Sequence, residues 1–284
     1  HGYSVICIEK GDYWSSDFAT DSLDWESKKP SFNPNIRNNR ADYSVDTSDS
    51  PIDIANFNGV GGSTVLFSGH YPRFHPSDFK TMTLDGVGVD WPFGYDALTP
   101  FYRDNETFLG VAGLNGDPAY PDDMNHLAQP VPLGSTGEKL ATTMNELGWH
   151  WWPSYSAIKT APSTQSLGNI CKNIGLCNTG CPIGAKGSAD ATFLADAISK
   201  GLKLVVNTTV LSVLRNDDGS ASGVLCRDDQ GKLTEIKSKA VMLAANALGS
   251  LRILSGSTTE QDYLGNSSGQ VGKNFMIHPL GYVE

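Results

Sequence analysis

Residues 1–12, HGYSVICIEKGD, decide the class of fold that we expect for this chain. Tyr3 to Glu9 is a short apolar run that ends in a carboxylate, which predicts a strand with an acid at its tip. In a dinucleotide-binding βαβ unit such an acid binds the ribose hydroxyls and follows a glycine-rich phosphate turn by about twenty residues. Only eight residues precede Glu9. We therefore expect that turn to lie upstream of residue 1 and the chain to be a fragment.

The composition predicts a folded, enzyme-sized domain. The chain has 284 residues, of which 39% are hydrophobic and 18% are charged, and this is enough to bury a sizeable core. Its formal net charge of -10 argues against nucleic acid and anionic membranes as partners. No apolar run approaches the roughly twenty residues that a membrane-spanning helix needs.

Hydrophobic periodicity predicts two helices in the middle of the chain and several strands after them. Ser135 or Thr136 caps a helix that Gly148 ends, and Ser188 caps another that Gly201 ends. Short strands are expected at residues 204–207, 210–214, 223–227 and 232–237.

An almost continuous apolar run at residues 240–245 predicts a fully buried parallel strand. Residues 246–254 should leave this strand as a short helix. A buried strand, a turn of small residues and a helix are the parts that a doubly wound sheet places against a nucleotide.

Three of the five cysteines lie within eleven residues, in the stretch CKNIGLCNTGCPIGAKGS at residues 171–188. Cys171, Cys177 and Cys181 have spacings at which thiols can converge on a metal or a cluster. Spacing alone leaves ligation, a local disulfide and idle thiols all open. Cys7 and Cys226 fall in predicted strands and are most simply buried thiols.

A glycine-rich turn occurs in residues 56–73, NFNGVGGSTVLFSGHYPR, where three glycines precede a Ser–Thr pair. Such a turn lets backbone N–H groups approach an anion at the start of a helix. A plain surface loop is the alternative, because a lone glycine-rich turn is a weak signal.

Taken together and in order, seven segments of the chain resemble the glucose–methanol–choline (GMC) oxidoreductases, which are FAD-dependent enzymes that oxidise alcohols and sugars. The resemblance covers nearly the whole chain. The segments are VICIEKG (5–11), GVGGST (59–64), DWPFGYDALTPFYRDNETFLGVAG (90–113), CNTGCPIGAKGS (177–188), NTTVLSVL (207–214), LAANALGSLRILSGS (243–257) and VGKNFMIHP (271–279).

The resemblance implies which residues contact FAD. Glu9 would bind the adenosine ribose, Val210 would contact the adenine edge through its backbone, and a turn of small residues would lie near the dinucleotide. That turn is Ala244, Ala245 and Asn246, and the pyrophosphate and flavin ring would be lined by Gly59, Gly61, Gly62, Ser63 and Thr64. The alternatives are a solvated carboxylate for Glu9, a core valine for Val210 and tight helix–sheet packing for the small residues.

The cysteine pattern resembles the bacterial branch of the family, which acts on sugars, gluconate and alcohols. In its glucose and fructose dehydrogenases a similar loop holds a [3Fe-4S] cluster that passes electrons to a cytochrome. The resemblance then implies Cys171, Cys177 and Cys181 as cluster ligands, and a cytochrome c and a small subunit as partners. It also favours a periplasmic or membrane-associated location over a cytoplasmic one.

The expected fold is α/β: a Rossmann-like, three-layer FAD-binding domain with an interleaved α+β substrate domain on an antiparallel sheet. Residues 1–75 and 185–284 should belong mostly to the FAD domain, and residues 76–184 mostly to the substrate domain and the cysteine loop. We assign no catalytic residue, because the family's catalytic histidine is expected beyond residue 284. Val65, Leu66 and Phe67 stand where relatives carry polar residues, so we expect no covalent flavin attachment there.

The expected activity is oxidation of a CH–OH group of a sugar, polyol, sugar acid or alcohol, by hydride transfer to the flavin. Two alternatives remain open. One is an FAD-dependent alcohol or sterol oxidase that uses dioxygen and holds no cluster. The other is a non-catalytic zinc-binding module built on the three clustered cysteines and a histidine.

Overall fold

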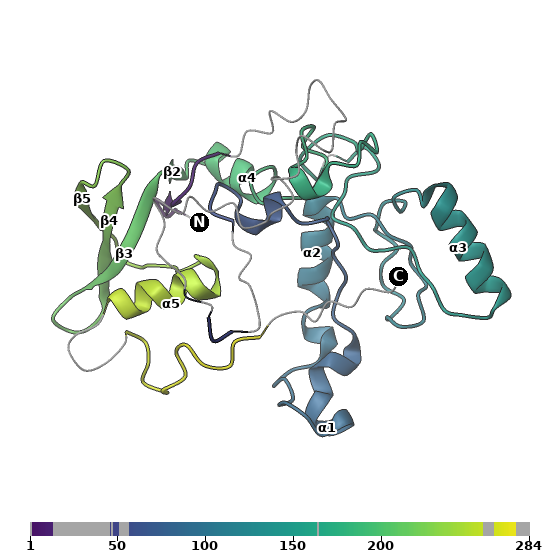
Figure 1. Cartoon of the computed structure of the whole chain (residues 1–284), viewed down its shortest axis with the longest axis horizontal. Helices are drawn as coiled ribbons and strands as arrows, with labels where there is room; N and C mark the ends of the chain where they lie inside the picture. Colours follow the sequence, from purple (N-terminus) through teal and green to yellow (C-terminus); the bar gives the residue numbers. More distant parts are fainter. Residues whose placement is uncertain are drawn as a thin grey trace. The chain divides into compact units, whose positions relative to one another are not determined.

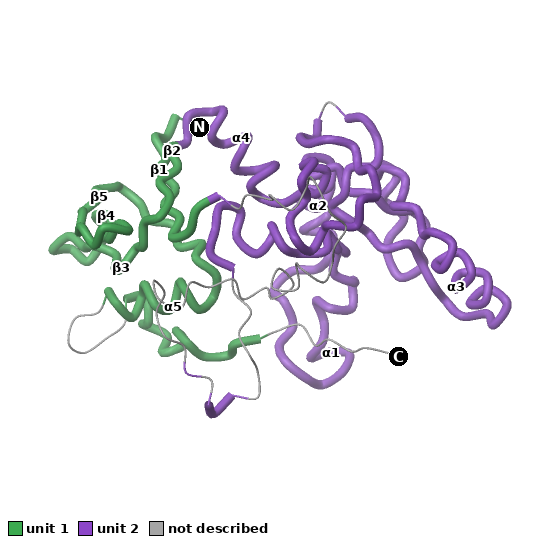
Figure 2. The backbone as a smooth tube through the Cα atoms, turned by 45° about the horizontal axis from the view of Figure 1, so that its top comes forward, with its two compact units in different colours: residues 1–12, 203–284 green, residues 13–202 purple. Residues whose placement is uncertain are grey.

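The chain divides into two units, residues 1–12 with 203–284 and residues 13–202, which Figure 2 draws in green and purple. The computed structural model describes residues 2–13, 46, 48–50, 57–163, 165–257 and 264–276. The mixed α/β class expected from the sequence is confirmed, because helices, a parallel strand pair and an antiparallel sheet are all present.

The parallel strand pair of the first unit is formed by β1 (Ile6–Ile8) and β2 (Lys203–Val205). Cys7 lies opposite Leu204 in this pair. The amide of Glu9 donates to the carbonyl oxygen of Val205 at 2.8 Å, which extends the pairing by one residue. The strand expected at residues 3–9 is therefore confirmed in its central part, with the acid at its carboxyl end.

An antiparallel sheet of three strands follows in the same unit, in the order β3 (Thr208–Arg215), β4 (Ala221–Asp228) and β5 (Leu233–Lys237). Figure 1 shows α5 (Asn246–Gly256) lying along this sheet, where it packs against β3. The contact is close, because a Cβ at Gly256 would lie 2.6 Å from the carbonyl oxygen of Leu211. Only glycine lets the helix approach the strand at this point.

The helices of the second unit are short and are joined by long irregular segments among its described residues. Its α-helices are α1 (Thr81–Asp85), α2 (Thr99–Leu109), α3 (Gly134–Glu146) and α4 (Phe193–Ser199). Its 3-10 helices are η3 (Gly62–Val65), η4 (Pro76–Lys80), η5 (Tyr95–Ala97) and η6 (Cys177–Thr179). Across the described part of the chain, no helix combines the length and the apolar character that crossing a membrane requires.

Both predicted helices exist, but their predicted caps are wrong. The N-cap position of α3 is Leu133, and that of α4 is Thr192 rather than Ser188, with no side-chain cap hydrogen bond at either. Instead, the carbonyl oxygen of Ser188 accepts a bond from the hydroxyl of Thr192 at 2.7 Å. Ser188 thus closes the turn before the helix, which a capping pattern cannot distinguish from the cap itself.

The strand expected at residues 240–245 is not formed. No strand is assigned there, and Met242 is 91% exposed. An apolar sequence supplies the side chains of a buried strand, but the strand also needs a neighbour for its backbone groups, and none of the described strands pairs with this segment. The antiparallel sheet at residues 208–237, by contrast, confirms the strands expected at residues 210–214, 223–227 and 232–237. The predicted domain boundaries stay a prediction.

A buried network of charged side chains holds the second unit together. The guanidinium of Arg73 donates to both carboxylate oxygens of Glu106, each at 2.6 Å, and to the hydroxyl of Tyr95 at 2.8 Å. His126 Nε2 lies 2.7 Å from Glu106, and Asp123 also accepts from the guanidinium. Burial opposes the charge of Arg73, but the bonds to Glu106, Tyr95 and Asp123 outweigh it and raise the pKa of the guanidinium. Every charge here has partners, which burial requires.

Replacing Glu106 by glutamine should lower the free energy of unfolding by about 3 kcal/mol, because the buried guanidinium then loses its main counter-charge. Denaturant unfolding measures this loss. The matched control is Asp196→Asn, which breaks the exposed pair between Asp196 and Lys200 at 2.7 Å and should cost less than about 1 kcal/mol. Equal losses in the two variants would contradict a stabilising role for the network.

Candidate functional site

The glycine-rich turn of the second unit adopts a conformation that requires glycine. Gly61 has a φ of 96° and Gly62 a φ of 57°, both in the left-handed region. A Cβ at Gly61 would lie 2.8 Å from the side chain of Val65 and 2.8 Å from that of Asp190, whereas one at Gly62 would meet nothing within 4 Å. The turn is thus tightly packed at Gly61 and open at Gly62, whose own amide donates to the carbonyl oxygen of Gly59 at 2.9 Å.

The hydroxyl of Thr64 ties this turn to the segment before α4. It donates to the carbonyl oxygen of Gly61 at 2.6 Å and accepts from the amide of Ala189 at 2.9 Å. The predicted flavin contacts Gly59, Gly61, Gly62, Ser63 and Thr64 therefore lie together in one short turn.

Asp190 contributes a buried carboxylate oxygen beside the turn. Its Oδ1 atom is buried and has no hydrogen-bond donor among the described residues. The same atom lies 2.9 Å from the position that a Cβ on Gly61 would take. A buried acceptor without a donor is costly, so this oxygen is suited to a ligand that brings an O–H or N–H group.

Lys186 crosses from the cysteine loop to the end of the glycine-rich turn. Its Nζ atom donates to the carbonyl oxygens of Val65 at 2.7 Å, Phe67 at 2.8 Å and Cys177 at 2.6 Å. Burial lowers the pKa of Lys186 to about 8, against the opposing effect of Cys177, Cys181 and Asp190. The pKa stays above neutrality, so the ammonium remains mostly charged at pH 7.

The three clustered cysteines are partly exposed free thiols. The sulfur of Cys171 accepts from the amide of Asn173, and that of Cys181 accepts from the amide of Ala185, both at 3.3 Å. Burial raises the pKa of Cys177, Lys186 lowers it, and the charges of Cys181 and Cys171 raise it again. The three thiols are thus near enough to influence one another.

The cysteine loop does not form a preassembled metal site. Within the described residues, no group of three or more His, Cys, Asp or Glu side chains is placed to hold a metal ion. The local disulfide that the spacing left open is absent, because all five cysteines of the chain are free. Ligation by Cys171, Cys177 and Cys181 stays a prediction.

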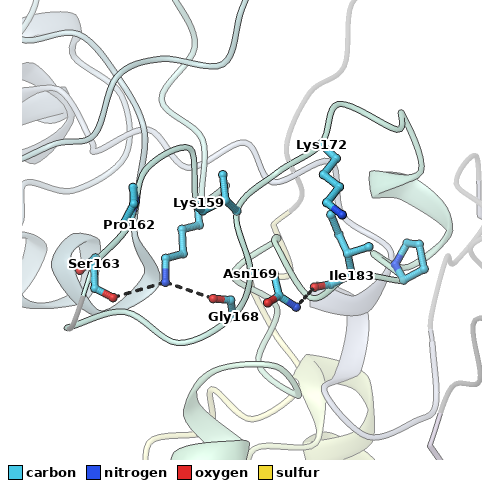
Figure 3. Close-up of a pocket in the computed structure, with 9 residues that line it drawn as sticks. Lys159, Pro162, Ser163, Gly168, Asn169, Lys172 and Ile183 are labelled. Atoms are coloured by element: carbon cyan, nitrogen blue, oxygen red, sulfur yellow. Dashed lines mark hydrogen bonds between the residues drawn. The ribbon is translucent and has the colours of Figure 1, made fainter.

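An open cavity of about 670 Å³ lies on the outside of the cysteine loop (Figure 3). The ammonium of Lys159 donates to the carbonyl oxygens of Ser163 and Gly168, and the amide of Asn169 donates to that of Ile183. The residues that line this cavity are Lys159, Pro162, Ser163, Gly168, Asn169, Ile170, Lys172, Pro182 and Ile183. These side chains include no candidate acid–base pair.

The other predicted contacts lie in the first unit. Glu9 follows β1, and its Oε1 atom accepts from the amide of Gly11 at 2.8 Å. Burial raises the pKa of this carboxyl, while hydrogen bonds from the amides of Gly11 and Lys10 act against the shift. Val210 is half-buried in β3 at a register shift and pairs with Cys226. The positions of Glu9 and Val210 are therefore compatible with a contact to a ligand and also with a purely structural role.

The predicted turn of small residues precedes α5. Ala244, Ala245 and Asn246 are all exposed, and Asn246 has a φ of 65°. The side-chain oxygen of Asn246 accepts from the amide of Leu248 at 3.2 Å. The structure thus brings these three residues together at the start of a helix, without the buried strand expected before them.

Two residues of the site escaped the sequence reasoning. Lys186 stands inside the quoted cysteine motif but received no role, although a lone charge among Pro, Ile, Gly, Ala and Ser was a signal of a specific partner. Asp190 follows the same motif and carried no signal of its own. Both residues lie against the glycine-rich turn or its end, more than a hundred positions earlier in the chain, which their local sequence does not show.

Comparison with known proteins identifies related chains. A family model described as GMC oxidoreductase matches residues 44–280. The chain is 35% identical over 289 residues to the 2-methyl-1,2-propanediol dehydrogenase of Mycolicibacterium austroafricanum, covering 98% of this chain and 51% of that protein. It is 28% identical over 227 residues to the fructose dehydrogenase large subunit of Gluconobacter japonicus, covering 78% and 41%. The chain spans about half the length of the curated relatives it matches.

The same relationship appears at the level of the fold. The FAD-dependent oxidoreductase from Chaetomium thermophilum superposes with a TM-score of 0.55 at 16% identity, over 89% of this chain and 43% of that one. At this identity the likeness concerns the fold alone, and it confirms the expected fold class.

Gly61→Ala should destabilise the protein by about 3 kcal/mol, because the new methyl group meets Val65 and Asp190 in a left-handed backbone. Gly62→Ala is the matched control and should cost only about 1 kcal/mol, since its φ is also positive but its surroundings are open. Denaturant unfolding of both variants measures these losses in free energy. Similar losses in Gly61→Ala and Gly62→Ala would contradict the tight packing at Gly61.

Proposed function

The chain belongs to the glucose–methanol–choline (GMC) oxidoreductase family, and from this premise we propose that the protein is an FAD-dependent oxidoreductase. Its substrate class is a CH–OH group in an alcohol, polyol, sugar or sugar acid. When bound, FAD supplies the acceptor for the hydride that leaves the substrate carbon. The described residues of this chain then bind and orient, and none of them is assigned as the catalytic base.

The observation that carries the proposal is the glycine-rich turn with the buried oxygen of Asp190 beside it. A Cβ at Gly62 would meet nothing within 4 Å, so the turn is uncrowded at this residue. Asp190 Oδ1 is buried and has no hydrogen-bond donor among the described residues. FAD brings a pyrophosphate that accepts from backbone N–H groups and ribityl hydroxyls that donate to carboxylates. The residues present therefore fit this cofactor. In the first unit, Glu9 at a strand end is a suitable acceptor for ribose hydroxyls.

We extend the proposal to a [3Fe-4S] cluster held by Cys171, Cys177 and Cys181. Backbone N–H groups already donate to two of the three sulfurs, as they do around iron–sulfur clusters, where such bonds tune the potential. Such a cluster would pass electrons to a cytochrome c, with a small subunit in the complex. A periplasmic or membrane-associated location is part of the same proposal.

One observation favours a second candidate function. The described residues hold no set of side chains already placed around a metal ion, so the three thiols have to move before they bind a cluster. An FAD-dependent alcohol or sterol oxidase that uses dioxygen requires no such rearrangement. The two candidates share the flavin chemistry and differ in iron content and in the electron acceptor.

The visible absorption spectrum of the full-length protein tests the central proposal. We expect resolved flavin bands that bleach when one member of a panel of sugars, polyols and alcohols is added without dioxygen. The panel should include sorbitol, gluconate and short diols, so that bleaching identifies the substrate class. A colourless protein that cannot be reconstituted with FAD would contradict the proposal and favour the zinc-binding alternative.

Iron and labile sulfide in the purified protein test the cluster. Each of the variants Cys171→Ser, Cys177→Ser and Cys181→Ser should lose both completely while the flavin bands remain, since three thiolates are needed for the cluster. Cys7→Ser is the control and should keep them, because Cys7 lies in β1, in the other unit. Wild-type protein that holds flavin but no iron, and reduces dioxygen during turnover, would support the oxidase instead.

A further inference from the structure

Lys186 is a buried cation whose three N–H donors are all used by backbone carbonyl groups. Lys186 is only 1% exposed to solvent. Two of the carbonyls, those of Val65 and Phe67, lie 121 and 119 residues earlier in the chain, and the third is that of Cys177. One ammonium thus holds the end of the glycine-rich turn and the middle of the cysteine loop at the same point.

The contact continues beyond the hydrogen bonds. Lys186 Nζ lies 5.1 Å from the centre of the Phe67 ring, within the range of a cation–π interaction. Phe67 in turn packs against the core cluster of Leu109, Val111 and Ala157. Lys186 therefore contacts both the turn and the loop, and it reaches the core of the second unit through Phe67.

Removing the ammonium would leave three carbonyl oxygens facing one another without a donor. Burying carbonyl groups without a donor raises the free energy of the folded state, and carbonyl dipoles that face one another repel. Because the carbonyls belong to two separate segments, the simplest relief is that these segments separate. The hydroxyl of Thr64 makes a further link from the turn, to the amide of Ala189, which lies just beyond the cysteine loop.

Lys159 provides a natural comparison in the same unit. It is also buried, and its Nζ donates to three carbonyl oxygens, those of Ser163, Ser166 and Gly168. All three acceptors lie within nine residues of Lys159 itself. This lysine closes a local loop, whereas Lys186 joins two distant segments.

We propose that Lys186 is a positioning residue that couples the cysteine loop to the glycine-rich turn, so that the two segments keep their shape only together. The inference rests on the proposed function in assigning the turn to the flavin and the loop to an electron-transfer role. It gives the protein a direct mechanical and electrostatic link between these two sites. A change in the loop, such as the binding of a cluster, then alters the turn through the carbonyls of Val65 and Phe67.

Hydrogen–deuterium exchange on full-length Lys186→Met, with Lys159→Met as the matched control, tests the coupling. In Lys186→Met, backbone exchange should rise about tenfold in both residues 59–67 and residues 171–185, since a lost charged hydrogen bond weakens local closure by at least that factor. Lys159→Met should affect residues 160–172 and leave residues 59–67 unchanged. Exchange that rises in only one of the two segments would overturn the proposal.

Residues 208–228, in the other unit, serve as the internal reference. An equal rise there would mean general destabilisation and would also overturn the proposal. If Lys186→Met does not accumulate as folded protein, Lys186→Gln takes its place, because the amide keeps two N–H donors without the charge. The same criteria apply to that variant.

Titration with FAD separates this inference from the proposed function. If wild-type protein binds FAD, Lys186→Met should bind it about tenfold more weakly with altered flavin bands, and Lys159→Met should match the wild type. Unchanged flavin binding in Lys186→Met would count against the coupling. If wild-type protein binds no FAD, the proposed function fails, while the exchange pattern still decides whether Lys186 couples the two segments.

Discussion

The second unit depends on buried ammonium groups that satisfy backbone carbonyls where no regular structure does so. Between Lys159 and Lys186 the described chain forms only the short helix η6 (Cys177–Thr179). A buried carbonyl that lacks a donor costs about 1–3 kcal/mol, so an irregular loop of this length needs donors from elsewhere. Each of the two lysines supplies three of them. The ammonium of Lys159 therefore holds residues 163–168, which precede the cysteine loop, and the ammonium of Lys186 holds the cysteine loop at Cys177.

The two units are stabilised by different means. In residues 13–202, the network of Arg73 and Glu106 follows the same rule as the lysines, since a buried charge is tolerated because every donor and acceptor is matched. In the first unit the ladder of β3, β4 and β5 satisfies the backbone, and α5 covers β3. The consequence is that the glycine-rich turn and the cysteine loop, which carry the proposed chemistry, belong to irregular backbone held by side chains, as binding sites often do.

This arrangement suits a site that positions a cofactor. The turn at Gly61 and Gly62 presents open backbone, and Asp190 presents an unmatched acceptor. Lys186 then links the turn to thiols that are close enough to perturb one another. In the proposed function, this lysine joins the segment that binds the flavin to the segment that transfers electrons. No residue of this chain is assigned as the catalytic base, and the chain spans about half the length of the curated relatives it matches.

The sequence by itself determined the family, the strand before Glu9, the strands of the antiparallel sheet and the helices α3 and α5. Each of these depends on short-range patterns of apolar residues, turn residues and motifs. It did not determine that residues 240–245 stay outside the sheets, since an apolar run cannot specify whether another strand pairs with it. Only the tertiary structure decided the roles of Lys186 and Asp190. Two of the three acceptors of Lys186, and the glycine turn beside Asp190, lie more than a hundred residues earlier in the chain, and a buried charge acquires its function from the groups that folding brings around it.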